Sequence, residues 1–96
     1  MKTQIDPGML EYICWNTQVA RAQDRLLLLC ISRWQRIWEE VVPSIDFIAG
    51  QVGVSRSTVK RMIGSLEHAG LIKVTRRAND KGRTSSRYEI DVEAAV

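Results

Sequence analysis

The 96-residue sequence is poor in residues that bind metals or cross-link a chain, with two cysteines and one histidine. A tetrahedral zinc site needs four ligands, and the sequence contains no paired ligand motif. Cys14 and Cys30 both lie within apolar helical patterns, which predicts buried, reduced thiols. We therefore expect no metal centre and no cofactor.

Long apolar segments and catalytic motifs are also absent. The longest apolar run is Leu26–Ile31, well short of the roughly 18 residues that cross a membrane. Met1–Gly8 has one lysine and no apolar segment, so we expect no signal peptide, a cytoplasmic protein and no membrane partner. Gly50 and Gly53 do not follow a predicted strand, as a phosphate-binding loop would. The sequence thus predicts a protein that is not an enzyme and has no evident small-molecule ligand.

Positive charge is concentrated in one part of the chain. Residues 1–54 carry five basic and six acidic side chains, whereas residues 55–87 carry nine basic and two acidic ones. The resulting net charge of +7 falls on two adjacent predicted elements, a helix and a hairpin. Such clustering is typical of a surface that binds phosphates, and a solvated run of charges is the simpler alternative.

Hydrophobic periodicity predicts two helices in the first part of the chain. The first covers about residues 8–19, with Asp6 as its cap and Pro7 at its first helical position. The second covers about residues 21–40 and is expected to end because of Pro43. Since its central apolar run surrounds the helix, other elements must cover it on more than one side.

Two shorter helices joined by a tight turn are predicted next. Ser44 is expected to cap the first, and Gly53 to end it in a left-handed conformation. Ser55 is expected to cap the second, which spans residues 55–69 and stops at Gly70. The apolar faces are Ile45, Ile48, Ala49 and Val52 on the first helix, and Val59, Met62, Ile63 and Leu66 on the second.

This spacing is that of a helix-turn-helix. The two helices of this motif cross closely at a small residue, and an apolar side chain fills the turn between them. Ala49 is the small residue, and Val54 is the apolar residue that fills the turn. The opposite face of the second helix is then exposed, and it carries Arg56, Ser57, Lys60, Arg61 and Gly64. A helix of this kind can enter the major groove of DNA and contact base edges. An amphipathic helical hairpin that contacts proteins is the alternative.

After Gly70 the apolar period changes from 3.6 residues to 2. Residues 71–77 and 87–92 alternate between apolar and polar side chains, which predicts two antiparallel strands. The intervening loop, residues 78–85, is basic and rich in turn-forming residues. A short third strand is expected near Val41 and Val42.

The segments Ser44–Ala49, Gly53–Val59 and Leu66–Ile72 resemble the winged helix-turn-helix superfamily. The similarity is strongest to winged-helix transcription regulators and to the DNA-binding domains of plasmid and phage replication initiators. It implies an α+β fold with a three-helix core, a β-hairpin wing and, in this chain, an extra N-terminal helix. The expected division is an N-terminal helical extension, residues 1–20, followed by a DNA-binding domain, residues 21–96.

The resemblance implies sequence-specific binding of double-stranded DNA. Helix 55–69 would enter the major groove, and the wing, residues 76–87, would contact the flanking backbone or the minor groove. The predicted contacts are Ser55, Arg56, Ser57, Thr58, Lys60 and Arg61 on the helix, and Arg76, Arg77, Lys81, Arg83 and Arg87 on the wing. A small transcription regulator is the leading role. The alternatives are a replication-initiation or partition module, and a protein-interaction domain that does not bind DNA.

We also expect a homodimer, because the predicted helices expose more apolar surface than one small wing can cover. The predicted interface residues are Met9, Leu10, Ile13, Cys14, Trp34 and Trp38. The alternative is that the N-terminal helix folds back over its own long helix.

Overall fold

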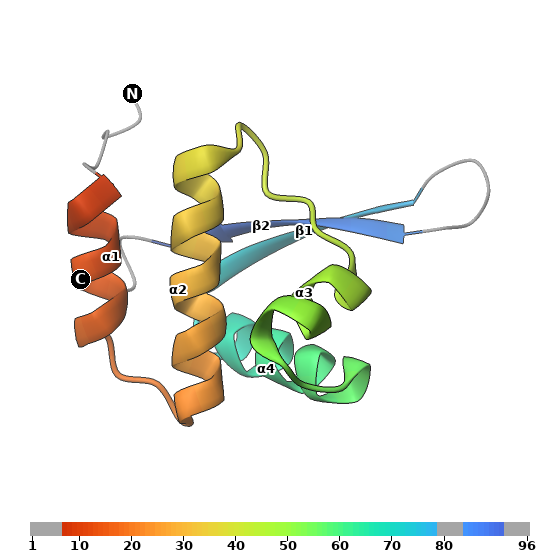
Figure 1. Cartoon of the computed structure of the whole chain (residues 1–96), viewed down its shortest axis with the longest axis horizontal. Coiled ribbons are helices and arrows are strands. Elements are labelled where there is room, and N and C mark those ends of the chain that lie inside the picture. Colours follow the sequence, from red (N-terminus) through yellow and green to blue (C-terminus); the bar gives the residue numbers. More distant parts are fainter. Residues whose placement is uncertain (1–6, 79–83, 92–96) are drawn as a thin grey trace.

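The computed structural model describes residues 7–78 and 84–91. The elements in chain order are α1 (Pro7–Asn16), α2 (Ala22–Ile37), α3 (Ile45–Val52), α4 (Arg56–His68), β1 (Ile72–Ala78) and β2 (Thr84–Ile90). In Figure 1, α2 lies between α1 on one side and α3 and α4 on the other. This arrangement confirms the predicted three-helix core with a hairpin wing and one extra N-terminal helix.

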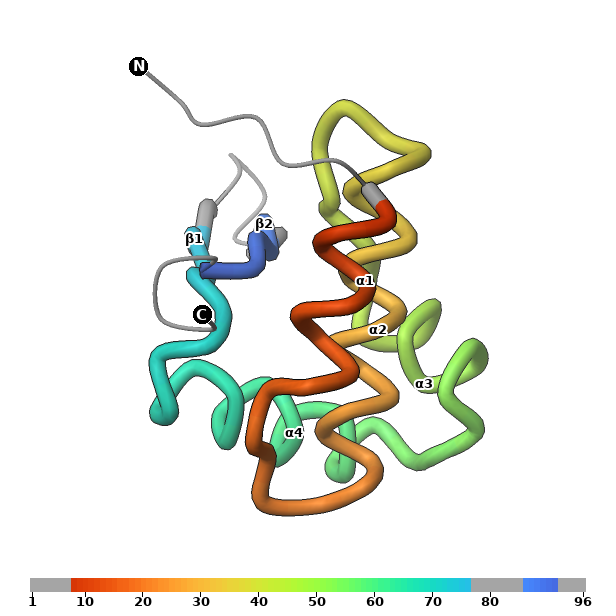
Figure 2. Tube along the Cα trace, turned by 90° about the vertical axis from the view of Figure 1, so that its left-hand side faces the viewer, coloured from red at the N-terminus to blue at the C-terminus, as the bar shows by residue number. Residues whose placement is uncertain are grey.

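Helix α1 packs alongside α2, as Figure 2 shows with α1 in front of α2. Its first residue is Pro7, as predicted, whereas the expected cap Asp6 lies outside the described residues. Leu10 and Cys14 are buried against α2. The last carbonyl groups of α1 have no partners within the helix, and the guanidinium of Arg25 on α2 donates hydrogen bonds to those of Cys14 and Trp15.

Helix α2 ends at Ile37, three residues before the predicted end and well before Pro43, so the prediction that proline stops this helix is wrong. Trp38 leaves the helical conformation, and its ring stacks on Trp34 with the ring centroids 5.7 Å apart. The chain then turns back to bury Val41 in the core. Packing of these side chains therefore ends the helix.

The turn chemistry between α3 and α4 is as predicted. The Ser44 hydroxyl accepts a hydrogen bond from the Phe47 N–H at 3.0 Å, and the Ser55 hydroxyl accepts one from the Thr58 N–H at 3.2 Å. Gly53 follows α3 with a φ of 81°, in the left-handed region that side chains with a Cβ rarely adopt. These caps fix where both helices of the predicted helix-turn-helix begin and where the first one ends.

One face of α4 faces the core. Val59, Met62, Ile63 and Leu66 are buried, and α4 contacts both α2 and α3. Leu27, Leu28 and Ile31 of α2 are buried in the same cluster, which confirms that α2 is covered on more than one side. Within the apolar run Leu26–Ile31, Leu29 and Cys30 are half-buried, and Leu26 is the most exposed residue, with 44% of its surface exposed.

The hairpin is antiparallel, with Ile72 opposite Ile90 and Val74 opposite Tyr88. It extends further into the predicted loop than expected, because β2 begins at Thr84, three residues before its predicted start, and Ala78 pairs with Thr84. Backbone pairing continues through Thr84, Ser85 and Ser86 since it needs no alternation of apolar side chains. The expected third strand is not found among the described residues, where Val41 makes a single hydrogen bond by accepting from the Tyr88 N–H at 2.9 Å.

Two further contacts hold the hairpin and the helices together. The Gln35 side chain on α2 accepts a hydrogen bond from the Ile90 N–H at 2.8 Å, and Tyr88 and Ile90 are buried against the helices.

In the described part of the chain, no helix combines the length and apolar character that a bilayer crossing requires.

The contrast between two leucines provides a test of this packing. Leu66 is 1% exposed and Leu26 is 44% exposed. We expect Leu66→Ala to lower the free energy of unfolding by about 2–5 kcal/mol, because it removes buried methyl groups and leaves a cavity. Leu26→Ala should cost less than about 1 kcal/mol. Urea denaturation followed by circular dichroism measures both values, and equal losses would contradict the burial of this face of α4.

Candidate nucleic-acid interface

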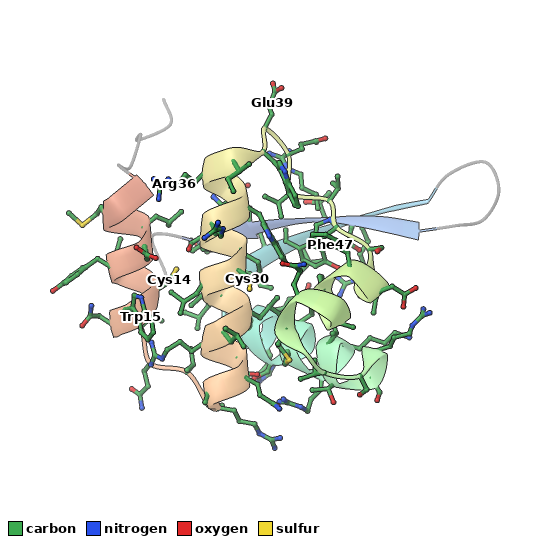
Figure 3. All side chains as sticks on the ribbon, in the orientation of Figure 1. Cys14, Trp15, Cys30, Arg36, Glu39 and Phe47 are labelled. Carbon is green, nitrogen blue, oxygen red and sulfur yellow. The ribbon has the colours of Figure 1, made fainter. Side chains whose placement is uncertain are left out.

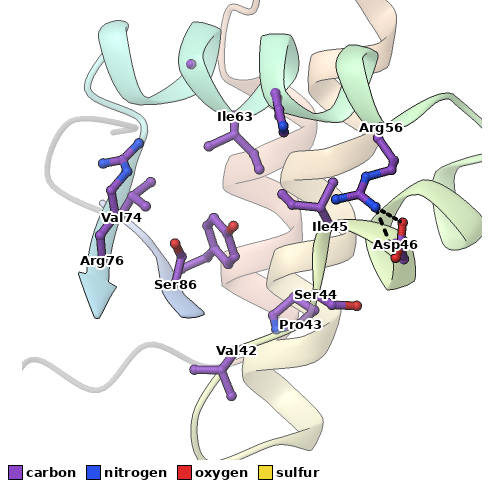
Figure 4. A pocket seen from close by; sticks show the side chains of 13 residues that line it. Val42, Pro43, Ser44, Ile45, Asp46, Arg56, Ile63, Val74, Arg76 and Ser86 are labelled. Atoms are coloured by element: carbon purple, nitrogen blue, oxygen red, sulfur yellow. Dashed lines mark hydrogen bonds and ion pairs between the residues drawn. The ribbon is translucent and has the colours of Figure 1, made fainter. Parts of the chain in front are cut away.

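A groove with a volume of about 690 Å³ lies between α4 and the hairpin. Figure 4 shows its walls, formed by α4, by the hairpin and by the segment that leads into α3. Its charged lining residues are Arg56 and Lys60 on α4, Arg76 on β1 and Asp46 on α3. Three of these four side chains are cationic, so the groove is suited to an anionic partner such as a phosphate backbone.

The first turns of α4 present polar side chains to solvent. Ser57, Lys60 and Gly64 are all exposed, on the side of the helix that is away from the buried stripe. Gly64 has open space beside it, because a Cβ at this position would meet no atom within 4 Å outside its own helix backbone. Among the predicted DNA-contacting cations whose side chains the structure describes, Lys60 alone makes no ion pair.

The other polar residues at the start of α4 are engaged within the chain. Ser55 caps the helix, and its hydroxyl also donates to Thr58 Oγ1 at 2.9 Å and lies 3.1 Å from Ser57 Oγ. The guanidinium of Arg56 contacts the Asp46 carboxylate at 3.2 Å, the interaction dashed in Figure 4. Both partners of this ion pair are largely exposed, at 63% and 70%.

Arg61 does not line the groove beside Lys60. Its guanidinium points toward the N-terminal end of α2, where it donates to Gln23 Oε1 at 2.7 Å and contacts Asp24 Oδ1 at 3.5 Å. Successive residues of a helix are about 100° apart, so neighbouring side chains leave it in different directions. The sequence alone groups Arg61 with Lys60, because it carries no direct signal of the partners on α2.

On the wing, Arg76 is held by a residue of α4. Its guanidinium makes two hydrogen bonds to the Glu67 carboxylate, at 2.9 and 3.0 Å. These bonds hold the pKa of Glu67 below its ordinary value. Strand periodicity could have indicated this position, because Arg76 shares a face with Ile72 and Val74, which face the helices.

The remaining wing residues are only partly described. Arg87 contacts Glu40 at 3.7 Å, in the segment after α2. Nothing is described of the Arg77 side chain, and Lys81 and Arg83 lie outside the described residues. Their roles at the wing stay predictions from the sequence.

The six predicted dimer-interface residues have very different environments. Leu10, Cys14 and Trp34 are buried inside the chain, Ile13 is half-buried, and Met9 and Trp38 are exposed. Figure 3 shows Cys14 between α1 and α2, so the N-terminal helix covers its own long helix. Burial raises the pKa of the Cys14 thiol to about 11, whereas Cys30 is only half-buried and so less enclosed than predicted.

A helix-turn-helix whose second helix is exposed beside a basic hairpin is thus present in the structure. The family model that describes the Crp-like helix-turn-helix domain matches residues 20–80. The chain belongs to this family. This Crp-like helix-turn-helix domain is a winged helix-turn-helix that binds DNA, and its family is not a catalytic one. The family match starts after α1, and the sequence matches no curated protein.

The ion pair between α4 and the wing makes a prediction about pH. We expect Arg76→Ala to raise the pKa of Glu67 toward its ordinary value, because the hydrogen bonds that favour the carboxylate are lost. NMR titration of the Glu67 side-chain carbonyl carbon measures this shift, with Arg56→Ala as the control that leaves it unchanged. In the unsubstituted protein, the pair stabilises the fold above the ordinary glutamate pKa. That contribution is lost as the pH falls through the lowered pKa.

Proposed function

We propose that this Crp-like helix-turn-helix domain binds double-stranded DNA sequence-specifically and regulates transcription. The observation that carries the proposal is the exposed face of α4, with Ser57 and Lys60 beside the cationic groove. Membership of the Crp-like family favours transcription regulation over the replication or partition role. The basic character of residues 55–87 disfavours a domain that only binds proteins.

In the proposed complex, α4 lies in the major groove, which is about 12 Å wide and admits one helix. Ser57 and Lys60 contact base edges, and Arg56 does so after exchanging Asp46 for DNA. An exchange of this kind is inexpensive, because exposed ion pairs contribute little net free energy. The wing residues Arg77, Lys81 and Arg83 contact flanking phosphates or the minor groove, which adds affinity that depends little on sequence.

The target duplex is first selected by the protein from a pool of randomised DNA, and a scrambled duplex of equal composition serves as the reference. We expect Lys60→Ala to weaken binding to the selected duplex by about 1–3 kcal/mol and binding to the scrambled duplex much less. The matched control is Arg33→Ala, which removes one exposed positive charge from α2 beside Glu11 of α1, away from the groove between α4 and the hairpin.

Fluorescence anisotropy titrations at a fixed salt concentration give both affinities. Two results would contradict DNA recognition by α4. In the first, the protein enriches no duplex from the pool. In the second, Lys60→Ala and Arg33→Ala lower both affinities equally.

We also propose that the protein acts as a homodimer through the outer face of α1. Met9, Tyr12 and Trp15 are exposed on this helix, each by more than half of its surface. Apolar and aromatic residues of this size are enriched at protein interfaces. A two-fold symmetric protein would match a two-fold symmetric DNA site.

Replacing Tyr12 and Trp15 together by serine should convert the dimer to a monomer, because it removes most of this exposed apolar surface. Multi-angle light scattering at tens of micromolar protein measures the mass of each species. Leu26→Ser, at another exposed apolar position, should leave the mass unchanged. A monomeric unsubstituted protein at that concentration would refute the dimer while leaving DNA binding by a single domain intact.

A further inference from the structure

We propose that Arg61 is a positioning residue, which fixes the orientation of the recognition helix α4 against α2 through Asp24 and does not itself contact DNA. The proposal rests on the proposed function and deepens it, because it assigns part of the sequence selectivity to a contact inside the protein. It replaces the expectation that Arg61 contacts bases together with Lys60.

The first step of the argument is the direction of the side chains. Arg61 and Ser65 are four residues apart and therefore share one flank of α4. Both reach Asp24 on α2, with Arg61 at 3.5 Å from Oδ1 and the Ser65 hydroxyl donating to Oδ2 at 2.9 Å. Figure 1 shows α4 crossing behind the lower, N-terminal half of α2, where this contact is made. Lys60 lines the groove, on the other flank of α4.

The second step is the burial of the carboxylate. Asp24 is 0% exposed, and it lies in the first turn of α2, where the helix dipole favours a negative charge. A buried carboxylate is very unfavourable unless it is paired and hydrogen-bonded, and Asp24 has both an ion-pair partner and a hydroxyl donor. If Arg61 turned outward to reach DNA, this charge would lose its cationic partner.

The contrast with Arg56 makes the argument specific to Arg61. The carboxylate that pairs with Arg56 is 70% exposed, so water can solvate it when Arg56 leaves. The side chain of Asp24 has no exposed surface, so water cannot replace Arg61 in this way. Arg61 is also tied by its 2.7 Å hydrogen bond to Gln23. Arg56 can therefore leave its carboxylate to contact DNA, whereas Arg61 cannot.

The third step links this network to recognition. The contacts of Arg61 and Ser65 with Asp24 join the middle of α4 to the start of α2, at the side of the helix that is not held by the apolar stripe. They therefore oppose rotation and tilt of α4 within the domain. Because base contacts depend on the placement of the helix in the groove, a change in tilt alters which base edges Ser57 and Lys60 reach.

The experiment uses the duplex selected by the unsubstituted protein and its scrambled counterpart. The two Asp24 contacts are tested with Asp24→Asn, Arg61→Gln and their double variant. Lys60→Gln is made in both the unsubstituted and the Asp24→Asn backgrounds, as the matched example of a direct DNA contact. For each variant, circular dichroism establishes the folded fraction, and titrations at several salt concentrations give the affinities for both duplexes.

We expect Asp24→Asn and Arg61→Gln each to lower the ratio of the two affinities roughly tenfold, the size of one misplaced base contact. The double variant should lose no more than either single variant, because both substitutions break one network. Lys60→Gln should cause a further loss in either background. The slope of log affinity against log salt should not change in Arg61→Gln, whereas loss of a phosphate contact would reduce it by about 0.9.

If Asp24→Asn and Arg61→Gln prevent folding, Gln23→Ala tests the same network. Gln23 is exposed, and its loss leaves Asp24 paired with Arg61. It should lower selectivity roughly twofold or more with the salt slope unchanged. A reduced salt slope in Arg61→Gln, or losses that add in the double variant, would show that Arg61 contacts DNA and overturn the proposal. Unchanged selectivity of the folded variants would show a purely structural network and also overturn it. If Lys60→Gln has no effect, the proposed function fails instead.

Discussion

The burial of one apolar face of α4 is the constraint on which the rest of the candidate interface depends. Val59, Met62 and Leu66 are packed against α2 and α3. Because each residue of a helix is turned by about 100° from the last, this packing fixes the direction in which each of the remaining side chains leaves the helix. Lys60 then lines the groove beside the wing, and Arg61 points toward α2. The chemistry of the exposed face is therefore a consequence of core packing, with no separate element needed to present it.

The parts of the fold that sequence predicts are those with a local chemical cause. A serine that caps a helix, a glycine that accepts a positive φ and an apolar stripe all act within a few residues, so Ser44, Gly53 and the buried face of α4 could be predicted. The contact between Arg61 and Asp24 spans 37 positions and exists only because α4 crosses the start of α2. The end of α2 likewise depends on packing, because Trp38 leaves the helix to stack on Trp34 and also contacts Phe47 of α3, nine positions further along the chain, with the ring centroids 5.8 Å apart. Periodicity carries no information about which helices cross.

Basic residues near the interface differ in how firmly the protein already holds them. The Arg56–Asp46 pair is exposed on both sides, the Arg76–Glu67 pair joins the wing to α4 with two hydrogen bonds, and the Asp24 carboxylate paired with Arg61 is fully buried. Net charge alone treats these arginines as equivalent. Their burial distinguishes Arg56, which can change partners, from Arg61, which maintains the geometry of the domain. The burial of the Arg76–Glu67 pair is intermediate.

Gly64 has an evolutionary consequence. It lies on the exposed side of the helix that we place in the major groove, and a Cβ there would have no atom within 4 Å other than those of its own helix backbone. Glycine inside a helix costs about 1 kcal/mol relative to alanine, so alanine here would gain helix propensity and its Cβ would meet no neighbouring element. A single substitution can thus add a new side chain beside Lys60 without disturbing the core. In the proposed complex, such a side chain would meet base edges that glycine does not reach, so one substitution at this position would alter the preferred target sequence.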